Sequence, residues 1–310
     1  MGETTRVSDR AVTPPGVWPD AWAAAAAHAA DRSCAGRLAL TFVRSGRRTV
    51  AAKVYSEGVL KASPPLYLAD DGAATCYLIH LGGGGVAGDM YHTRLELQAG
   101  ARAVLTPQSA TKVFRSQRAP VVQTTHVHLA AESSLDLWAE PVIAYEGARY
   151  RQVTEVDMDP RATLLWTDIF TPGWAPDGRP YAYDEIRAKL VVRMAGELVL
   201  YDHVRLGPPP EPALASPWPH GIGQLEGYSH YGSMLVIDPY MDETFRDRLW
   251  EALAPYAAHV RVGLAALRVP GFALRVLAPS TPAIAAVFQV ARALVYEAVF
   301  GSPPAPLRKL

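Results

Sequence analysis

The chain has 310 residues with 30 basic and 30 acidic side chains, and 49% of its residues are hydrophobic. This balance is typical of a globular protein that buries a substantial core, and it excludes a disordered chain. A net charge near zero argues against a nucleic-acid-binding protein, because such proteins gain much of their affinity by neutralising phosphates.

Signals for secretion or membrane insertion are weak. The apolar stretch 21–27 lacks the preceding basic region and the leucine-rich core of a signal peptide. No apolar run in the sequence predicts a membrane-spanning helix. Cys34 and Cys76 lie far apart and form no CxxC pair, which is typical of two reduced thiols. We therefore expect a cytoplasmic protein that does not bind a membrane.

Two segments lack the patterns of regular structure. Residues 1–34 contain Pro14, Pro15 and Pro19 and are predicted to form an irregular leader. Residues 205–222 are rich in proline and predict a stiff connector. We expect residues 35–310 to form a single β-rich domain that includes two helices near its C-terminal end.

Strand patterns dominate from residue 37 to about residue 269. Leu38, Leu40 and Phe42 alternate with less apolar residues, and Thr93 and Leu95 show the same period of two. Such alternation indicates half-buried strands, which we expect to pair antiparallel. The predicted fold class is mainly β.

A weak internal repeat refines this prediction. The segments 97–105, 129–137 and 158–166 each end one strand, turn on small or polar residues and begin another strand. The spacing of roughly thirty residues predicts stacked hairpin units in a solenoid-like sheet. Three unrelated hairpins would also show this pattern, because all hairpins share it.

Two helices are predicted after the strands. The first covers residues 242–257, where apolar residues recur at helical spacing. The second begins with Thr281 as its N-cap, has Pro282 in the first turn and ends at Gly301.

A glycine-rich loop precedes Asp89. Its glycines are Gly82, Gly83, Gly84, Gly85 and Gly88. The loop lacks the lysine and the following helix of a phosphate-binding loop, so a tight bend that passes close to another segment is the better interpretation. Asp89 is then a fixed carboxylate at the exit of the bend.

Other candidate sites each have a plain alternative. In the polar segment 106–116, Lys112 and Arg115 could pair with Asp89 or with a partner protein, or the segment could be a solvated turn. His126 and His128 share one face of a strand and are weak candidates for metal ligands, but a hydrogen-bonded or solvent-facing pair is favoured because no third ligand is evident.

Hydrolase chemistry has little support. The segment 227–232 has one residue too many for a GxSxG nucleophile elbow, and no strand-to-helix step surrounds it. Asp168 and Asp184 do not indicate acid–base chemistry, because the sequence cannot show that two carboxylates face each other. We therefore expect no enzymatic activity.

The order of these motifs resembles the UreD/UreH family of urease accessory proteins between about residue 37 and about residue 300. The similar segments are 76–89, with its Gly-Asp ending, 100–116, with Thr-Lys-Val-Phe-Arg-Ser, and 140–152, 164–173 and 200–206. The chain departs from the family in three places: Leu81 replaces the usual proline before the glycines, residues 306–310 lack a Pro-Arg-aromatic ending, and the leader is long.

The resemblance implies a β-rich fold and a non-catalytic role in urease maturation. The implied partners are a helical accessory protein of the UreF type, through it a nickel GTPase of the UreG type, and the structural subunits of urease. The resemblance also implies that Ni²⁺ passes through an internal tunnel, with no tightly bound cofactor.

A conduit for Ni²⁺ needs weak stations, because a complete ligand set would trap the ion. The motif positions make Asp89, Lys112, Asp168 and Asp202 the candidate tunnel residues. Supporting motif residues are Gly82, Gly83, Gly84, Gly88, Arg115, Ser116 and Arg149. Buried ion pairs that hold the sheet are an alternative role for the charged residues. The alternative function is a β-rich interaction scaffold with no metal role.

Overall fold

The computed structural model describes residues 34–208, 219, 221 and 223–307. The chain divides between Cys34 and Ala35, and the fold below is that of the unit Ala35–Leu310. The predicted leader falls outside the described residues apart from Cys34, and so does most of the predicted connector.

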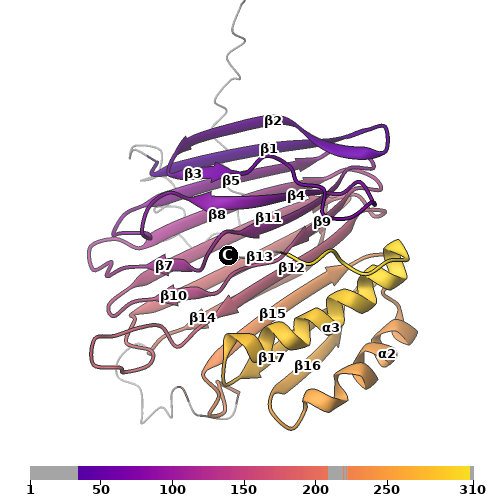
Figure 1. Ribbon diagram of the computed structural model, residues 1–310. Helices are drawn as coiled ribbons and strands as arrows, with labels where there is room; N and C mark the ends of the chain where they lie inside the picture. The colour runs from indigo at the N-terminus through magenta and orange to yellow at the C-terminus, as the bar shows by residue number, and fades with distance from the viewer. Residues whose placement is uncertain (1–33, 209–218, 220, 222, 308–310) are drawn as a thin grey trace, which may run out of the picture. The chain divides into compact units, whose positions relative to one another are not determined.

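The first sheet contains seven strands. They are β1 (Gly36–Ser45), β2 (Arg48–Gly58), β5 (Met90–Leu97), β8 (Val121–Leu129), β11 (Arg149–Met158), β13 (Glu185–Met194) and β14 (Glu197–Leu206). Their order is β14-β13-β11-β8-β5-β1-β2 (Figure 1). The pairs from β1 through β5, β8 and β11 to β13 are parallel, and the flanking pairs β1·β2 and β13·β14 are antiparallel.

The second sheet contains ten strands. They are β3 (Leu60–Ala62), β4 (Ala74–His80), β6 (Arg102–Pro107), β7 (Thr111–Val113), β9 (Ser134–Leu137), β10 (Val142–Ala144), β12 (Thr163–Phe170), β15 (His230–Ile237), β16 (Arg261–Ala266) and β17 (Gly271–Ala278). The main order is β16-β17-β15-β12-β9-β6-β4-β3, with β10 beside β12 and β7. Its β4·β6, β6·β9 and β9·β12 pairs are parallel.

The mainly β, solenoid-like architecture is confirmed. The expected antiparallel pairing is wrong for the interior of the first sheet and for β4·β6, β6·β9 and β9·β12, but it is confirmed for β12·β15, β15·β17 and β16·β17. The repeat explains the parallel pairs. Leu97 pairs with Leu129, which pairs with Met158, so equivalent strands of successive coils lie side by side and run in the same direction. Each repeat is a corner that takes the chain from the first sheet to the second, not a hairpin.

The inner faces of the two sheets enclose apolar side chains. One cluster contains Leu40, Leu95 and Leu129 from the first sheet, together with Leu105 and Leu164 from the second. A separate cluster includes Tyr150 and Ile186 from the first sheet and Phe170 from the second. The alternation read from the sequence thus identifies the residues that point between the sheets.

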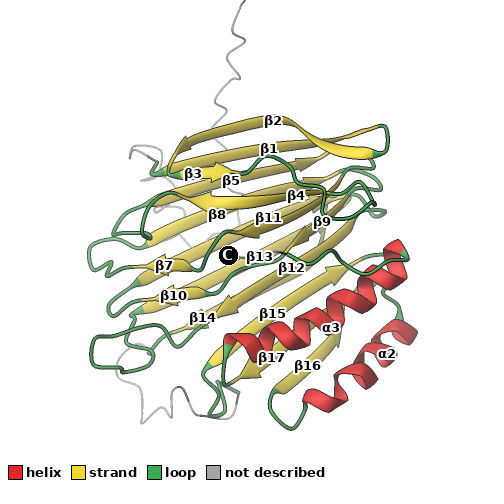
Figure 2. Cartoon of the chain, in the orientation of Figure 1, coloured by secondary structure: helices red, strands yellow, loops and turns green. Residues whose placement is uncertain are grey.

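Two helices cover the outer face of the second sheet (Figure 2). They are α2 (Glu243–Leu253), which is followed by the short helix η1 (Ala254–Tyr256), and α3 (Thr281–Phe300). Both predicted helices are confirmed with shifted ends. The side chain of Ser280, rather than Thr281, caps α3. Strands β16 and β17 lie between the helices in the chain, and the sequence reading missed β17.

Helix α3 also corrects the expectation about membrane spans. Its 20 residues are long and apolar enough to cross a membrane by length and composition alone. Ile284, Val287 and Phe288 of α3, however, are fully buried in the cluster against the second sheet. Its apolar character is therefore used in packing.

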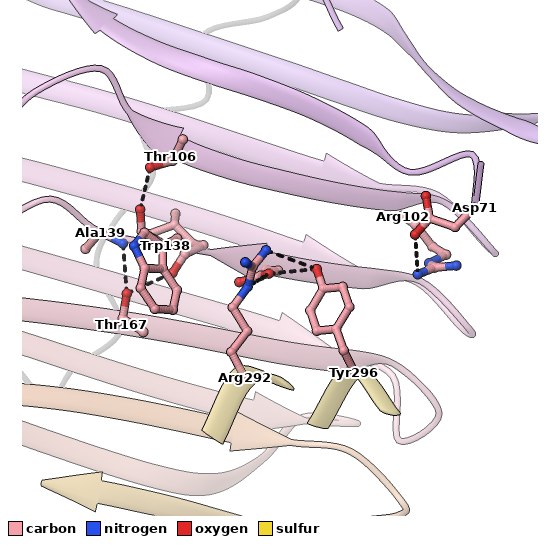
Figure 3. A network of polar contacts seen from close by, with 10 residues as sticks. Asp71, Arg102, Thr106, Trp138, Ala139, Thr167, Arg292 and Tyr296 are labelled. Atoms are coloured by element: carbon pink, nitrogen blue, oxygen red, sulfur yellow. Dashed lines mark hydrogen bonds and ion pairs between the residues drawn. The ribbon is translucent and has the colours of Figure 1, made fainter. Parts of the chain in front are cut away.

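A buried polar network joins α3 to the second sheet (Figure 3). Asp136 on β9 accepts hydrogen bonds from Arg292 Nε and from the Tyr296 hydroxyl, each at 2.7 Å. The Trp138 ring lies 5.3 Å from the Arg292 guanidinium carbon. These contacts fix one face of the helix on the sheet.

Candidate functional site

A band of polar residues interrupts the apolar interior of the first sheet. Thr93, Thr125 and Thr154 are neighbours in register on β5, β8 and β11. Two residues earlier on β8 and β11, Gln123 pairs with Gln152. We call these five residues the polar row. It runs across the strands, in the direction in which the coils stack, because parallel pairing places equivalent residues side by side.

Asp202 lies two strands beyond the polar row at the edge of the first sheet, with the apolar Leu190 between them. Thr154 pairs with Leu190, and Leu190 pairs with Asp202 on the edge strand β14. The Asp202 carboxylate Oδ2 lies 2.7 Å from Arg275 Nη2, and Arg275 Nη1 donates to the Ser233 hydroxyl. Arg275 therefore reaches from the second sheet to the first.

Asp168 faces the polar row from the second sheet. It pairs in register with Ser233, which pairs with Arg275. Asp168 Oδ1 accepts a hydrogen bond of 2.8 Å from Gln152 Nε2, and its Oδ2 accepts one of 3.0 Å from Trp166 Nε1. The carboxylate thus joins the two sheets across their interior.

The surroundings of Asp168 raise its pKa to about 6. Burial is the largest cause, since it penalises the charged form. Hydrogen bonds from Gln152 and Trp166 act in the opposite direction, and the charges of Asp202 and Arg275 raise and lower the pKa respectively. Asp168, Asp202 and Arg275 therefore form one electrostatic group.

A cavity of about 220 Å³ lies toward the other end of the polar row. Its lining includes His80, Lys112, Thr93, Gln123 and Tyr150, together with the glycine loop. The Tyr150 hydroxyl lies 2.9 Å from Gln123 Oε1 and 3.2 Å from Gln152 Oε1. Polar contacts therefore continue from the cavity to Gln152 and Asp168.

The glycine loop makes the close approach predicted from its sequence. A Cβ on Gly84 would lie 2.7 Å from the Lys112 carbonyl oxygen, and one on Gly85 would lie 2.7 Å from Val121 Cγ1. Gly84 and Gly88 also have positive φ values of 149° and 86°. Strand β5 follows the loop, so the helix that a phosphate-binding loop requires is missing there. Gly82 and Gly83 are exposed.

Asp89 closes this loop. Its Oδ2 accepts hydrogen bonds from the Val86 backbone N at 2.8 Å and from the Tyr91 hydroxyl at 2.7 Å. Tyr91 lines the cavity, so Asp89 contacts the cavity wall through it. Lys112 is exposed at the cavity, and Arg115 pairs with Glu146 at 3.5 Å.

Ser116 and Arg149 hold a corner of the fold. The buried Ser116 hydroxyl donates to the Phe114 carbonyl at 2.7 Å and accepts from the Arg149 backbone N at 3.2 Å. Both contacts are structural, and they connect the end of the polar segment to the start of β11.

The predicted histidine pair lies on the outer face of the first sheet, opposite the polar row. His126 Nδ1 lies 3.4 Å from Glu155 Oε2, and the exposed His128 is beside Asp157 in register. Within the described residues, no group of three or more His, Cys, Asp or Glu side chains is placed to hold a metal ion. Asp184 is exposed, unlike Asp168.

Ser229 and His230 are the remaining candidates for hydrolase chemistry. The Ser229 hydroxyl lies 2.8 Å from His230 Nδ1 and also donates to the Pro279 carbonyl at 3.0 Å. Burial lowers the pKa of His230. The pair stands at the start of β15, without the strand-to-helix turn of a nucleophile elbow.

Sequence reasoning missed Gln152, Ser233 and Arg275. Gln152 had a usable signal, because it occupies an inward position in phase with Val156 and Met158. Ser233 and Arg275 reach Asp168 only through the pairing of β12, β15 and β17, which no local pattern reveals.

The fold and this site define a β-solenoid protein with a polar row through its interior and helices over one sheet. The sequence matches the model of the UreD urease accessory protein family over residues 34–309, and the chain belongs to this family. It is 38% identical to the urease accessory protein UreD of Bacillus sp. (strain TB-90) over 276 residues, which cover 89% of this chain and 99% of that protein.

Two further relatives carry the same description. The UreD of Actinomyces naeslundii is 38% identical over 277 residues, covering 89% of this chain and 99% of the relative. The UreD of Lachnoclostridium phytofermentans is 36% identical over 260 residues, covering 84% and 93% respectively. Membership of this family supports a role in urease maturation.

Proposed function

We propose that this chain is a cytoplasmic, non-enzymatic scaffold that joins a complex of the UreF and UreG types to apo-urease and lets Ni²⁺ pass along the polar row. The family match supports the maturation role. One structural observation supports the passage: the polar row connects the cavity beside Lys112 with Asp168, and Ser233 and Arg275 connect Asp168 with Asp202.

The chemistry of the row suits a transient cation. Ni²⁺ accepts carboxylate and other oxygen ligands, and a complete set would hold it too tightly for release. Asp168 and Asp202 lie on different sheets and each has protein partners, so each offers a weak station. The hydroxyl and amide groups of the polar row can replace part of the hydration shell of the ion, as in ion channels. Ni²⁺ is thus cargo and not a resident cofactor.

A partly exposed aromatic ladder supports the docking of partner proteins. The Phe114 and Tyr145 rings lie 4.9 Å apart, and the Tyr145 and Trp174 rings lie 5.1 Å apart. Trp174 is 51% exposed, and Arg115 lies beside the ladder in sequence. Exposed Trp, Tyr and Arg side chains are typical anchors of protein interfaces. We propose urease subunits and a helical accessory protein as the partners, and neither nucleic acid nor a membrane.

The alternative function is an interaction scaffold with no metal role. The ion pair between Arg275 and Asp202 favours it, because a purely structural role, in which the pair holds β14 against β17, is sufficient to explain the pair. Activation of urease distinguishes the two functions.

The test replaces Asp168 and Asp202 by asparagine, singly and together, in cells that produce urease and its accessory proteins at limiting nickel. Asp89 is unsuitable because it closes the glycine loop. We expect urease activity and nickel content to fall several-fold while co-purification of the complex survives. The matched control is Asp157→Asn on the outer face. Full activation by the double variant would leave only the metal-independent scaffold.

A further inference from the structure

We propose that Arg275 is a tethered counter-cation, whose guanidinium occupies the position between Asp202 and Asp168 where a divalent cation would otherwise bind. Its charge keeps cation binding weak at this end of the polar row. The inference rests on the proposed passage and assigns to it a residue that prevents trapping.

The position of Arg275 is defined from both sheets. Its Nη2 lies 2.7 Å from Asp202 Oδ2 on the first sheet, and its Nη1 donates to Ser233 on the second. Ser233 is the register partner of both Arg275 and Asp168, so the three side chains project from adjacent strands. The guanidinium thus lies within electrostatic reach of both carboxylates.

The chemistry of arginine suits a counter-cation. The guanidinium keeps its positive charge at all physiological pH values and has no lone pair for a metal. A cation that binds Asp202 must therefore displace Arg275, and the displaced charge stays near because it is covalently attached. The resulting repulsion favours release of the ion, which a conducting site requires.

A second observation is a buried polar group in this part of the interior that can accept a further polar partner. Thr154 is fully buried, and its Oγ1 has no hydrogen-bond partner among the protein atoms. Thr154 belongs to the polar row and is linked in register through Leu190 to Asp202. A buried hydroxyl of this kind is ordinarily satisfied by water or an ion. The row is therefore suited to a hydrated cation beside the Arg275 site.

The test measures binding of Ni²⁺ to the purified full-length chain by equilibrium dialysis. Arg275→Gln removes the charge and keeps hydrogen-bond donors. We expect it to bind Ni²⁺ about tenfold or more tightly than the unaltered chain, because a positive charge a few ångströms from the ion is gone. Arg275→Lys keeps the charge and should bind as weakly as the unaltered chain. The matched control is Arg261→Gln on β16, where the exposed Arg261 pairs with Glu226 at 3.3 Å.

Surface histidines also bind nickel, so a control must show that any gained affinity belongs to this site. The double variant Arg275→Gln with Asp202→Asn is that control. Its affinity should return to that of the unaltered chain. If Arg275→Gln does not fold, Arg275→Met, which keeps the aliphatic stem, takes its place. No gain in affinity, or an equal gain in Arg275→Lys, would overturn the proposal. Because dialysis needs no urease, this result is independent of whether Asp168→Asn and Asp202→Asn impair activation.

Discussion

Arg292 on α3 and Asp136 on β9 form an ion pair with an Nε–Oδ2 distance of 2.7 Å, and both side chains are more than nine-tenths buried. The Tyr296 hydroxyl donates to the same carboxylate oxygen (Figure 3). Burial, followed by the charge of Asp136, raises the pKa of Tyr296, so its hydroxyl remains a donor. The network sets the position of α3 on the second sheet, because any slip of the helix would leave a buried charge without its partner.

Loss of one partner of this pair should strongly destabilise the protein. We expect Arg292→Leu to lower the free energy of unfolding by about 3–5 kcal/mol, since it leaves Asp136 charged and buried. The double variant with Asp136→Leu should recover much of that loss. Urea unfolding measures both. The control Arg248→Gln breaks the exposed pair with Glu297 and should cost less than about 1 kcal/mol. A double variant as unstable as Arg292→Leu would contradict this account.

The raised pKa of Asp168 predicts a pH-dependent stability. Its pKa is raised from 3.8 to about 6 in the folded protein, so the folded state binds more protons than the unfolded state between these values. The free energy of unfolding that this group contributes therefore falls as pH rises from about 4 to about 6, by about 1–3 kcal/mol. Asp168→Asn should remove this dependence in urea unfolding at a series of pH values. An unchanged slope after the substitution would assign the titration to another group.

The glycine loop offers a matched pair of substitutions. Gly84→Ala places a Cβ 2.7 Å from the Lys112 carbonyl at a φ of 149°, so we expect a loss of about 1–3 kcal/mol in stability. Gly83→Ala meets no atom within 4 Å and should be neutral within about 0.5 kcal/mol. Thermal unfolding measures both, and hydrogen exchange at β7 locates the effect. Equal effects of the two substitutions would show that the loop does not need its close approach to Lys112.

The sequence predicted which face of each strand is buried better than it predicted which strands pair and in which direction. Period-two alternation identified Leu38, Leu40 and Phe42 as inward residues, because burial of alternate residues depends only on the pleat. The direction of pairing depends on topology, which alternation does not report. The repeat held that information, since corners of equal length bring Leu97, Leu129 and Met158 into parallel register.

The candidate site was predictable only where it coincided with a local motif. Asp168 and Asp202 came from the family resemblance, and their separation by more than thirty residues hides any relation between them. Arg275 and Ser233 are still further along the chain from Asp168, and the pairing of three strands brings them together. An interior carboxylate depends on such distant partners, so its environment cannot be read from the residues beside it.

The corners of the repeat provide a final prediction. Gly100 and Glu132 occupy equivalent corner positions with φ values of 67° and 60°. A non-glycine residue is strained there, so Glu132→Gly should raise the free energy of unfolding by about 0.5–1 kcal/mol. The lost pair with Arg161 is exposed and subtracts little from this gain.

Two substitutions test whether this gain comes from the backbone conformation. Gly100→Ala, whose Cβ would meet no atom within 4 Å, should cost about 1 kcal/mol through strain alone. Ala131→Gly changes the residue before Glu132 in the same corner, and Ala131 is not among the residues with positive φ. This substitution should therefore lower the free energy of unfolding by about 0.5–1 kcal/mol. Urea unfolding of the three variants gives the comparison. If Glu132→Gly and Ala131→Gly shift stability in the same direction, the gain expected at Glu132 does not arise from its left-handed conformation. The two corners are then not equivalent in energy, although each follows a strand whose last residues, Leu97 and Leu129, pair in register.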